Sequence, residues 1–299
     1  MNHWVIHWFL MDRNEIDLTN IEQFHVKVFE KYKNFILSTF DKITISFAKT
    51  EKTNPMLIQY IEHILEILFD GKKIDFKIKD NNQKVGEFET FRDNVLQNID
   101  TNENILYTHI KGVYRIKAVP SLLKKEIIWI WKMYQVVFND ELLKFLNDNV
   151  MCGPDFSIYD SAFHTIKTGK WNPIAHIYKT YTLPLKKELE KNKGNKVINK
   201  YVDILPDMNK KSPWAYLGTF YWINMNRLCS YIKEKGFSKE DIIIISNEFQ
   251  KYNRPSNINS GVTNLNGHVE RMTFANNVSE YFLPSIVEMK NCSFFKLKE

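Results

Sequence analysis

The sequence predicts an α/β fold in which helices cover both faces of a mostly parallel central sheet. Candidate strands and helices alternate four times within the first 113 residues, and the connections between them are a few residues long. This alternation is typical of parallel strands joined by helical crossovers. With 299 residues, of which 44% are hydrophobic and 14% aromatic, the chain can bury a large core. We therefore expect one domain over residues 1–299.

The first half of the chain contains the four expected strand and helix pairs. Thr19 and Glu22 form a capping-box pattern that predicts the start of the first helix. Asn54 and Pro55 are a cap and a first-turn proline for the second helix, which we expect to end at Gly71. The expected strands are Trp4–Leu10, Ile43–Ala48, Ile74–Ile78 and a run that begins at Ile105, and a further helix is expected over Glu87–Ile99.

The second half is expected to be mainly helical at first and more irregular later. We expect helices over Ser121–Phe138 and Asp140–Asn147, with a short exit at Val150–Asp155. The polar, Lys-rich stretch Ser157–Lys211 is predicted to form acceptor-side loops or a lid. A helix over Asn224–Lys235 follows an aromatic-rich segment and ends at Gly236, whereas Ile242–Ile245 fits either a strand or a helix.

Composition disfavours several classes of protein. The formal net charge is +6, but basic and acidic residues are interleaved, and only Lys186–Lys200 concentrates positive charge, so nucleic-acid binding is a minor hypothesis. Three well-separated cysteines without a CxxC pair argue against a structural zinc site and a disulfide framework, and favour a reducing, cytoplasmic location. The apolar run His3–Met11 is too short to span a membrane. Neither GxGxxG nor GxxxxGK[ST] occurs, which disfavours a dinucleotide fold and a P-loop NTPase.

The most informative segment is Ile105–Val113, an apolar run that stops on His109, Lys111 and Gly112. In open α/β sheets, ligands bind beyond the carboxyl ends of the strands. A lysine beside a permissive glycine is well suited to contact a phosphate there. The alternative is an ordinary exit from a strand into a loop.

Four segments, taken in order, carry a resemblance to a known family. They are Ile105–Val113, matching His-x-Lys-Gly-Val; Trp131, Lys132 and Phe138, matching Trp-Arg with a later Phe; Leu217–Ile223, matching Ser-Gly-Asn-Phe-Trp-Trp-Ala; and Ser279–Leu283, matching Arg/Ala-Glu-aromatic-Leu. In this order the segments resemble bacterial, protist and viral glycosyltransferase-like proteins, distantly similar to the rhamnan-synthesis family. Lys132 replaces the family's Arg, and Thr219 replaces its Asn.

The resemblance implies a GT-A-like fold that transfers a sugar from a nucleotide-sugar donor, with a UDP-sugar as the first candidate. The acceptor would be a glycan, a protein or another hydroxyl compound. Residues 1–119 would form the nucleotide-sugar-binding half, and residues 120–299 the acceptor-side half. The chain contains no Asp-x-Asp, the usual ligand of Mn or Mg in metal-dependent members, so dependence on a divalent metal stays open.

Candidate site residues follow from the resemblance together with the chemistry of the transfer reaction. His109 and Lys111, with Thr108 beside them, would contact the donor diphosphate, Gly112 would allow close approach, and Arg115 would be a second cation. Further donor-side candidates are Lys132, Gly218 and Thr219, and the candidate carboxylate bases are Asp155, Glu270 and Glu280. Two alternatives remain: a nucleic-acid-binding or nucleic-acid-modifying protein, and a noncatalytic relic of the transferase fold.

Overall fold

The fold is seen in a computed structural model, which describes residues 1–10, 12–80, 87–110, 120–155, 186–187, 189–191, 194–205, 214, 216, 219–251 and 278–296. These residues contain a seven-stranded sheet with the order β3-β2-β1-β4-β6-β5-β7. The strands are β1 (Asn2–Phe9), β2 (Lys42–Lys49), β3 (Lys73–Asp80), β4 (Asn104–His109), β5 (Met151–Pro154), β6 (Tyr221–Asn224) and β7 (Cys292–Phe295).

The sheet is mixed but mostly parallel. β3, β2, β1 and β4 are parallel to one another, and β5 is parallel to β7. β6 pairs antiparallel with both β4 and β5, so it runs against the direction of the other strands. The predicted α/β class is confirmed.

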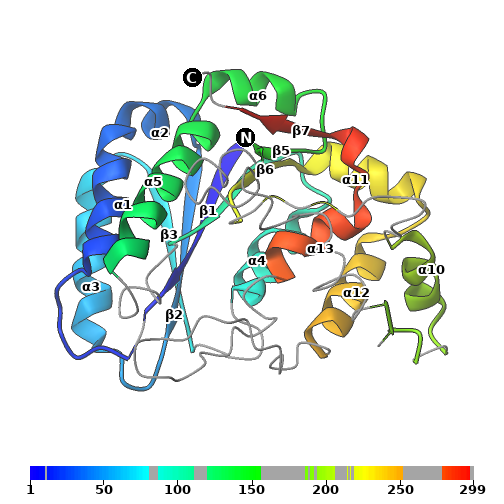
Figure 1. The fold of residues 1–299 in the computed structure, drawn as a ribbon, viewed down its shortest axis with the longest axis horizontal. Coiled ribbons are helices and arrows are strands. Elements are labelled where there is room, and N and C mark those ends of the chain that lie inside the picture. The colour runs from blue at the N-terminus through cyan, green and yellow to red at the C-terminus, as the bar shows by residue number, and fades with distance from the viewer. Residues whose placement is uncertain are drawn as a thin grey trace.

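Helices cover both faces of this sheet (Figure 1). One layer holds α1 (Asn20–Lys31), α2 (Lys33–Thr39), α3 (Pro55–Leu68), α5 (Pro120–Val137) and α6 (Asp140–Leu146). The other layer holds α4 (Phe88–Asn94), α10 (Lys196–Ile204), α11 (Met225–Glu234), α12 (Lys239–Lys251) and α13 (Val278–Ile286). Because strand side chains alternate between faces, Trp4, Ile6 and Trp8 pack in the first core and Val5 in the second. None of the described helices is long and apolar enough to cross a membrane.

Local sequence signals set the ends of several helices. The capping box at Thr19 and Glu22 is present at the start of α1. The Asn54 side chain accepts a hydrogen bond from the Met56 N–H, and Pro55 occupies the first turn of α3. Gly71 and Gly236 have φ values of 83° and 76°, which glycine adopts without the strain of a side chain.

The structure differs from the sequence prediction in several segments and decides one assignment that the sequence left open. The helix expected over Glu87–Ile99 ends at Asn94 and continues as a 3-10 turn, Leu96–Asn98. Ile242–Ile245, for which the sequence fitted either a strand or a helix, are helical and lie in α12, which packs in the helical layer. Part of the stretch expected to be irregular, Ser157–Lys211, forms α10, whose Ile198 and Tyr201 are buried in the core. The short strand β7 was not predicted, because four residues give no clear periodicity.

Candidate functional site

The order of the strands reverses between β1 and β4. From β1 the chain builds outward through β2 to β3, and β4 then pairs on the opposite side of β1. In open α/β sheets, ligands bind outside the carboxyl ends of the strands at such a switch point. His7 and His109 pair across this point, and the Ile110 N–H donates to the His7 carbonyl at 2.8 Å. Two histidines therefore mark the place where the topology favours a ligand.

Glu87 connects side chains from distant parts of the chain at this point. Its Oε1 accepts a hydrogen bond from Thr219 Oγ1 at 3.0 Å, and its Oε2 contacts His109 Nδ1. The Tyr107 hydroxyl donates to the backbone carbonyl of Glu87 at 3.0 Å. A carboxylate only accepts hydrogen bonds, so Nδ1 of His109 carries the proton in this contact. We call His7, Ser46, Glu87, Thr90, His109 and Thr219 the switch-point cluster.

The second ring nitrogen of His109 is the most unusual atom of the switch-point cluster. Nε2 is buried and forms no hydrogen bond with any of the described residues. The ring packs edge-on against Phe220, with 5.9 Å between ring centroids. A buried polar atom without a partner costs free energy, so such atoms in native proteins call for an explanation.

His7 belongs to a second chain of hydrogen bonds. Its Nδ1 lies 2.9 Å from Thr90 Oγ1, and Thr90 Oγ1 donates to Ser46 Oγ at 3.0 Å. Because the single hydroxyl proton of Thr90 goes to Ser46, Thr90 accepts from His7 Nδ1–H. Burial lowers the pKa of His7 to about 4, although the Glu87 carboxylate opposes this shift. His7 is therefore neutral near pH 7.

Thr219 holds an uncommon backbone conformation. Its φ is 58°, in the left-handed region, and its side chain is fully buried. A β-branched residue rarely adopts this conformation, because its side chain crowds the backbone. The hydrogen bond to Glu87 and the packing of Phe220 against Tyr134, at 4.9 Å between centroids, hold this segment in place. Backbone strain of this kind gathers at functional sites.

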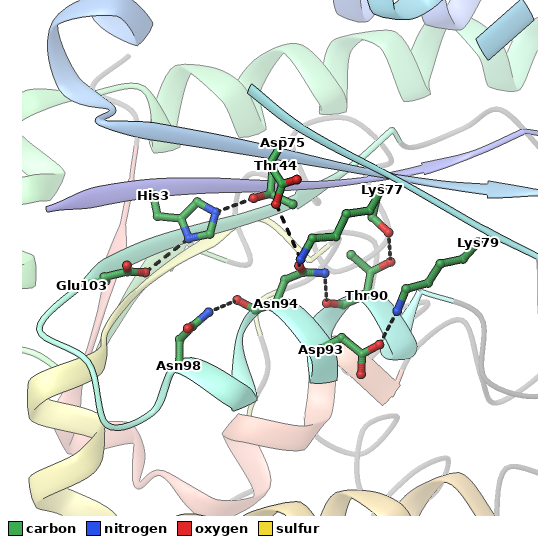
Figure 2. Close-up of polar contacts among 11 residues, drawn as sticks. His3, Thr44, Asp75, Lys77, Lys79, Thr90, Asp93, Asn94, Asn98 and Glu103 are labelled. Atoms are coloured by element: carbon green, nitrogen blue, oxygen red, sulfur yellow. Dashed lines mark hydrogen bonds and ion pairs between the residues drawn. The ribbon is translucent and has the colours of Figure 1, made fainter. Parts of the chain in front are cut away.

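A layer of polar contacts lies between the sheet and α4 (Figure 2). Lys77 Nζ donates to Asn94 Oδ1 at 2.6 Å, and Lys79 forms an ion pair with Asp93. Asn94 Nδ2 in turn donates to the Thr90 carbonyl at 2.9 Å. These contacts tie α4 to the edge strand β3, and Glu87 immediately precedes α4.

The same layer contains a second buried histidine, His3. Its Nε2 lies 2.8 Å from Thr44 Oγ1, and its Nδ1 lies 3.3 Å from Glu103 Oε2. Burial lowers the pKa of His3 to about 4, and the charges of Lys42 and Lys77 act in the same direction. His3 thus belongs to the packing of the sheet against the layer that holds α4.

The structure brings some of the predicted site residues together and separates others. His109 and Thr219 meet through Glu87, although Thr219 and Glu87 are 132 residues apart in the chain. Thr108 faces the opposite core, where its buried hydroxyl accepts from Trp4 Nε1 at 2.9 Å, so it does not join His109.

The remaining predicted residues lie elsewhere. Lys132 is half-buried in α5, in the helical layer opposite α4. Asp155 follows β5, and its N–H donates to the Phe295 carbonyl at 3.0 Å. Glu280 lies in α13. The predictions for Lys111, Gly112, Arg115, Gly218, Glu270 and the side chain of Glu280 fall outside the described residues.

Sequence reasoning missed Glu87, His7 and Thr90. His3 and His7 lie on one face of an otherwise apolar strand, and this period of two could have indicated a polar face. Glu87 gave no such signal, because a glutamate at the start of an expected helix is ordinary.

The described residues do not build a metal centre. No group of three or more His, Cys, Asp or Glu side chains in this part of the chain could hold a metal ion. Both oxygens of Glu87 are already engaged by Thr219 and His109. Because Nδ1 of His109 donates to Glu87, Nε2 is the ring nitrogen that a ligand could contact.

Comparisons with protein-family models, with curated proteins and with solved structures give no match to this chain. The fold and the switch-point cluster define its class. It is an α/β protein with a mostly parallel sheet, and a histidine and carboxylate pair lies at the switch point of that sheet.

Proposed function

We propose that the protein is a glycosyltransferase with a GT-A-like fold, which moves a sugar from a nucleotide-sugar donor to a hydroxyl acceptor. The observation that carries the proposal is the buried Nε2 of His109 at the switch point of the sheet, which has no hydrogen-bond partner in the described part of the chain. His109 is also the residue at which the family resemblance expects a contact with the donor diphosphate.

The arrangement of the sheet supports this class. Four parallel strands in the order β3-β2-β1-β4 are followed by one antiparallel strand, β6, and then by β5 and β7. A mostly parallel sheet with helices on both faces is the part of the GT-A-like expectation that this order supports. The switch point between β1 and β4 is where such a sheet would bind the nucleotide.

The proposed reaction makes a clear demand on the site. The acceptor oxygen attacks the anomeric carbon, the bond from that carbon to the diphosphate oxygen breaks, and the electron pair leaves with the nucleoside diphosphate. In an inverting transferase a carboxylate base takes the proton of the acceptor hydroxyl, whereas a retaining transferase need not use a base of that kind. His109, with Lys111 two residues further along the chain, would supply positive charge to the leaving diphosphate. Asp155, Glu270 and Glu280 remain the proposed bases.

The proposal is tested by incubating the purified protein with UDP-, GDP- and dTDP-sugars, with Mn²⁺ or with EDTA, and measuring the released nucleotide. We expect release of one nucleotide, loss of that release in Lys111→Ala, and full release in Lys27→Ala. Lys27 is a matched control because it is an exposed lysine on α1. No release from any donor, together with no thermal shift by any nucleotide, would contradict the proposal.

A further inference from the structure

We propose that Glu87 is a positioning residue that holds His109 so that its Nε2–H donates to the diphosphate of the donor. The identity of the ligand rests on the proposed function. The assignment of Glu87 rests on the contacts within the switch-point cluster alone.

Contacts with Glu87 and Phe220 set the orientation of the His109 ring. Glu87 has both carboxylate oxygens engaged, Oε1 by Thr219 and Oε2 by His109 Nδ1. The Tyr107 hydroxyl fixes the Glu87 backbone, and Phe220 packs against the imidazole ring. The ring therefore has one defined orientation, in which Nδ1 contacts Glu87 and Nε2 is the nitrogen that a ligand could contact.

The role proposed for Nε2 of His109 is that of a hydrogen-bond donor. The carboxylate of Glu87 is almost fully buried, and a buried charge needs an opposite charge nearby. His109 is the ring that contacts this carboxylate directly, through Nδ1. With both nitrogens protonated, Nδ1–H donates to Glu87 and Nε2–H donates to the ligand.

A donor at Nε2 of His109 would suit an anionic ligand such as a diphosphate. A doubly protonated ring attracts anionic oxygens and repels metal cations, and charge-assisted hydrogen bonds are the stronger kind. The described residues contain no metal site that could neutralise a diphosphate. The Nε2–H of His109, held in place by Glu87, would supply one charge-assisted hydrogen bond to the diphosphate.

The other role for Nε2 is that of a base. In a ring protonated only at Nδ1, Nε2 would accept a proton from the acceptor hydroxyl and would not bind a diphosphate. The two roles differ in one measurable property. The affinity for a free diphosphate depends on Nε2 only if Nε2–H is the donor to the diphosphate.

The test compares two substitutions that separate the ring nitrogens. The amide of His109→Asn reaches the position of Nδ1 and keeps a donor for Glu87, but it removes Nε2. The amide of His109→Gln reaches the position of Nε2 but gives up the contact with Glu87. Glu87→Gln removes the charge at the positioning residue. Glu89→Gln is its matched control, because Glu89 lies two residues away and pairs with Arg92 at 3.9 Å.

Binding of UDP and of inorganic pyrophosphate is measured by calorimetry on proteins whose fold is checked by circular dichroism. We expect the affinity for both probes to fall about tenfold or more in His109→Asn and in Glu87→Gln, and to be unchanged in Glu89→Gln. His109→Gln is expected to bind better than His109→Asn. If His109 only tied β4 to α4, His109→Asn would bind as the wild type does, and that result would overturn the proposal.

A second readout does not depend on the folding of any variant. In wild-type protein labelled with ¹⁵N in histidine, we expect the Nε2 resonance of His109 to move when pyrophosphate is added. An unmoved resonance in the presence of bound pyrophosphate overturns the inference. Binding through Nε2 without nucleotide release from any sugar donor would instead overturn the proposed transferase activity and leave the role of Glu87 standing.

Discussion

Thr219 combines a costly backbone conformation with a side chain that the switch-point cluster uses. A φ of 58° at a β-branched residue stores strain of roughly 1–3 kcal/mol. Its hydroxyl meanwhile donates to a buried carboxylate oxygen of Glu87. The strained residue Thr219 therefore helps to orient the carboxylate of Glu87, which contacts His109.

Two substitutions at Thr219 separate the strain from the hydrogen bond. Thr219→Val keeps the shape and the strain but removes the hydroxyl, so we expect the free energy of unfolding to fall by about 2 kcal/mol. Thr219→Asn introduces a residue that tolerates the left-handed conformation, so we expect it to be at least as stable as the wild type. Urea denaturation measures both, and a Val variant as stable as the Asn variant would contradict this interpretation.

His3 and His7 make stability depend on pH. Their pKa values are lowered by burial to about 4, whereas the unfolded rings take up a proton near 6.5. The unfolded state therefore binds more protons between pH 6.5 and 4. Stability is complete above this window and falls as the pH drops through it, by about 1.4 kcal/mol per pH unit for each histidine.

We expect His3→Gln and His7→Gln each to reduce the slope of unfolding free energy against pH between pH 6.5 and 4. His63→Gln, at an exposed position on α3, is the matched control and should keep the wild-type slope. Chemical denaturation at several pH values gives the slope. An unchanged slope in both variants would show that these rings are not buried in the neutral form.

At the scale of elements, the polar layer beneath α4 holds the short helix in place (Figure 2). Asn94 is 2% exposed and bonds both to Lys77 on β3 and to the carbonyl of Thr90 within α4. We expect Asn94→Ala to lower the free energy of unfolding by about 1–3 kcal/mol and to weaken nucleotide binding, because α4 follows Glu87. Asn226→Ala, at an exposed position in α11, is the control. If Asn94→Ala is less stable than the wild type but binds nucleotide with full affinity, the position of α4 does not affect the site.

The start of α1 depends on a buried carboxylate. Glu22 is fully buried and accepts hydrogen bonds from Arg13 Nη1 at 2.6 Å, Trp8 Nε1 at 2.9 Å and the Thr19 N–H at 2.8 Å. Glu22→Gln leaves the buried Arg13 without an opposite charge, so we expect a loss of about 3–5 kcal/mol. Thermal and urea unfolding of Glu22→Gln beside Glu30→Gln, an exposed site on the same helix, measure this loss. A loss as small as that of the control would contradict the expectation.

The elements that the sequence predicted well have strong local signals. The capping box of α1 and the Asn54 and Pro55 start of α3 specify helix ends through contacts within a few residues. The strands β1, β2 and β4 are long enough to show a clear apolar pattern in the sequence. The strand β7 and the helical state of Ile242–Ile245 depend on packing against distant segments, which a local pattern does not contain.

The candidate site was predicted only in part for the same physical reason. His109 and Thr219 were chosen from motifs, and the structure shows that they share Glu87. Thr108 adjoins His109 in sequence, but alternation along β4 turns its side chain to the other core. Glu87 becomes notable only when the fold brings Thr219 beside it.

At the scale of the whole molecule, both halves of the chain contribute to one sheet. β1 to β4 come from the first half, and β5, β6 and β7 extend the sheet from the second (Figure 1). Thr219, just before β6, reaches Glu87 beside β4, so the second half helps to build the switch-point cluster. The central claim is that this cluster binds the diphosphate of a nucleotide-sugar donor.

A crystal structure of the protein with UDP tests that claim most directly. We expect the diphosphate at the carboxyl ends of β1 and β4, with one of its oxygens within hydrogen-bonding distance of His109 Nε2. UDP bound elsewhere on the molecule, or no bound UDP at a saturating concentration, would contradict the claim.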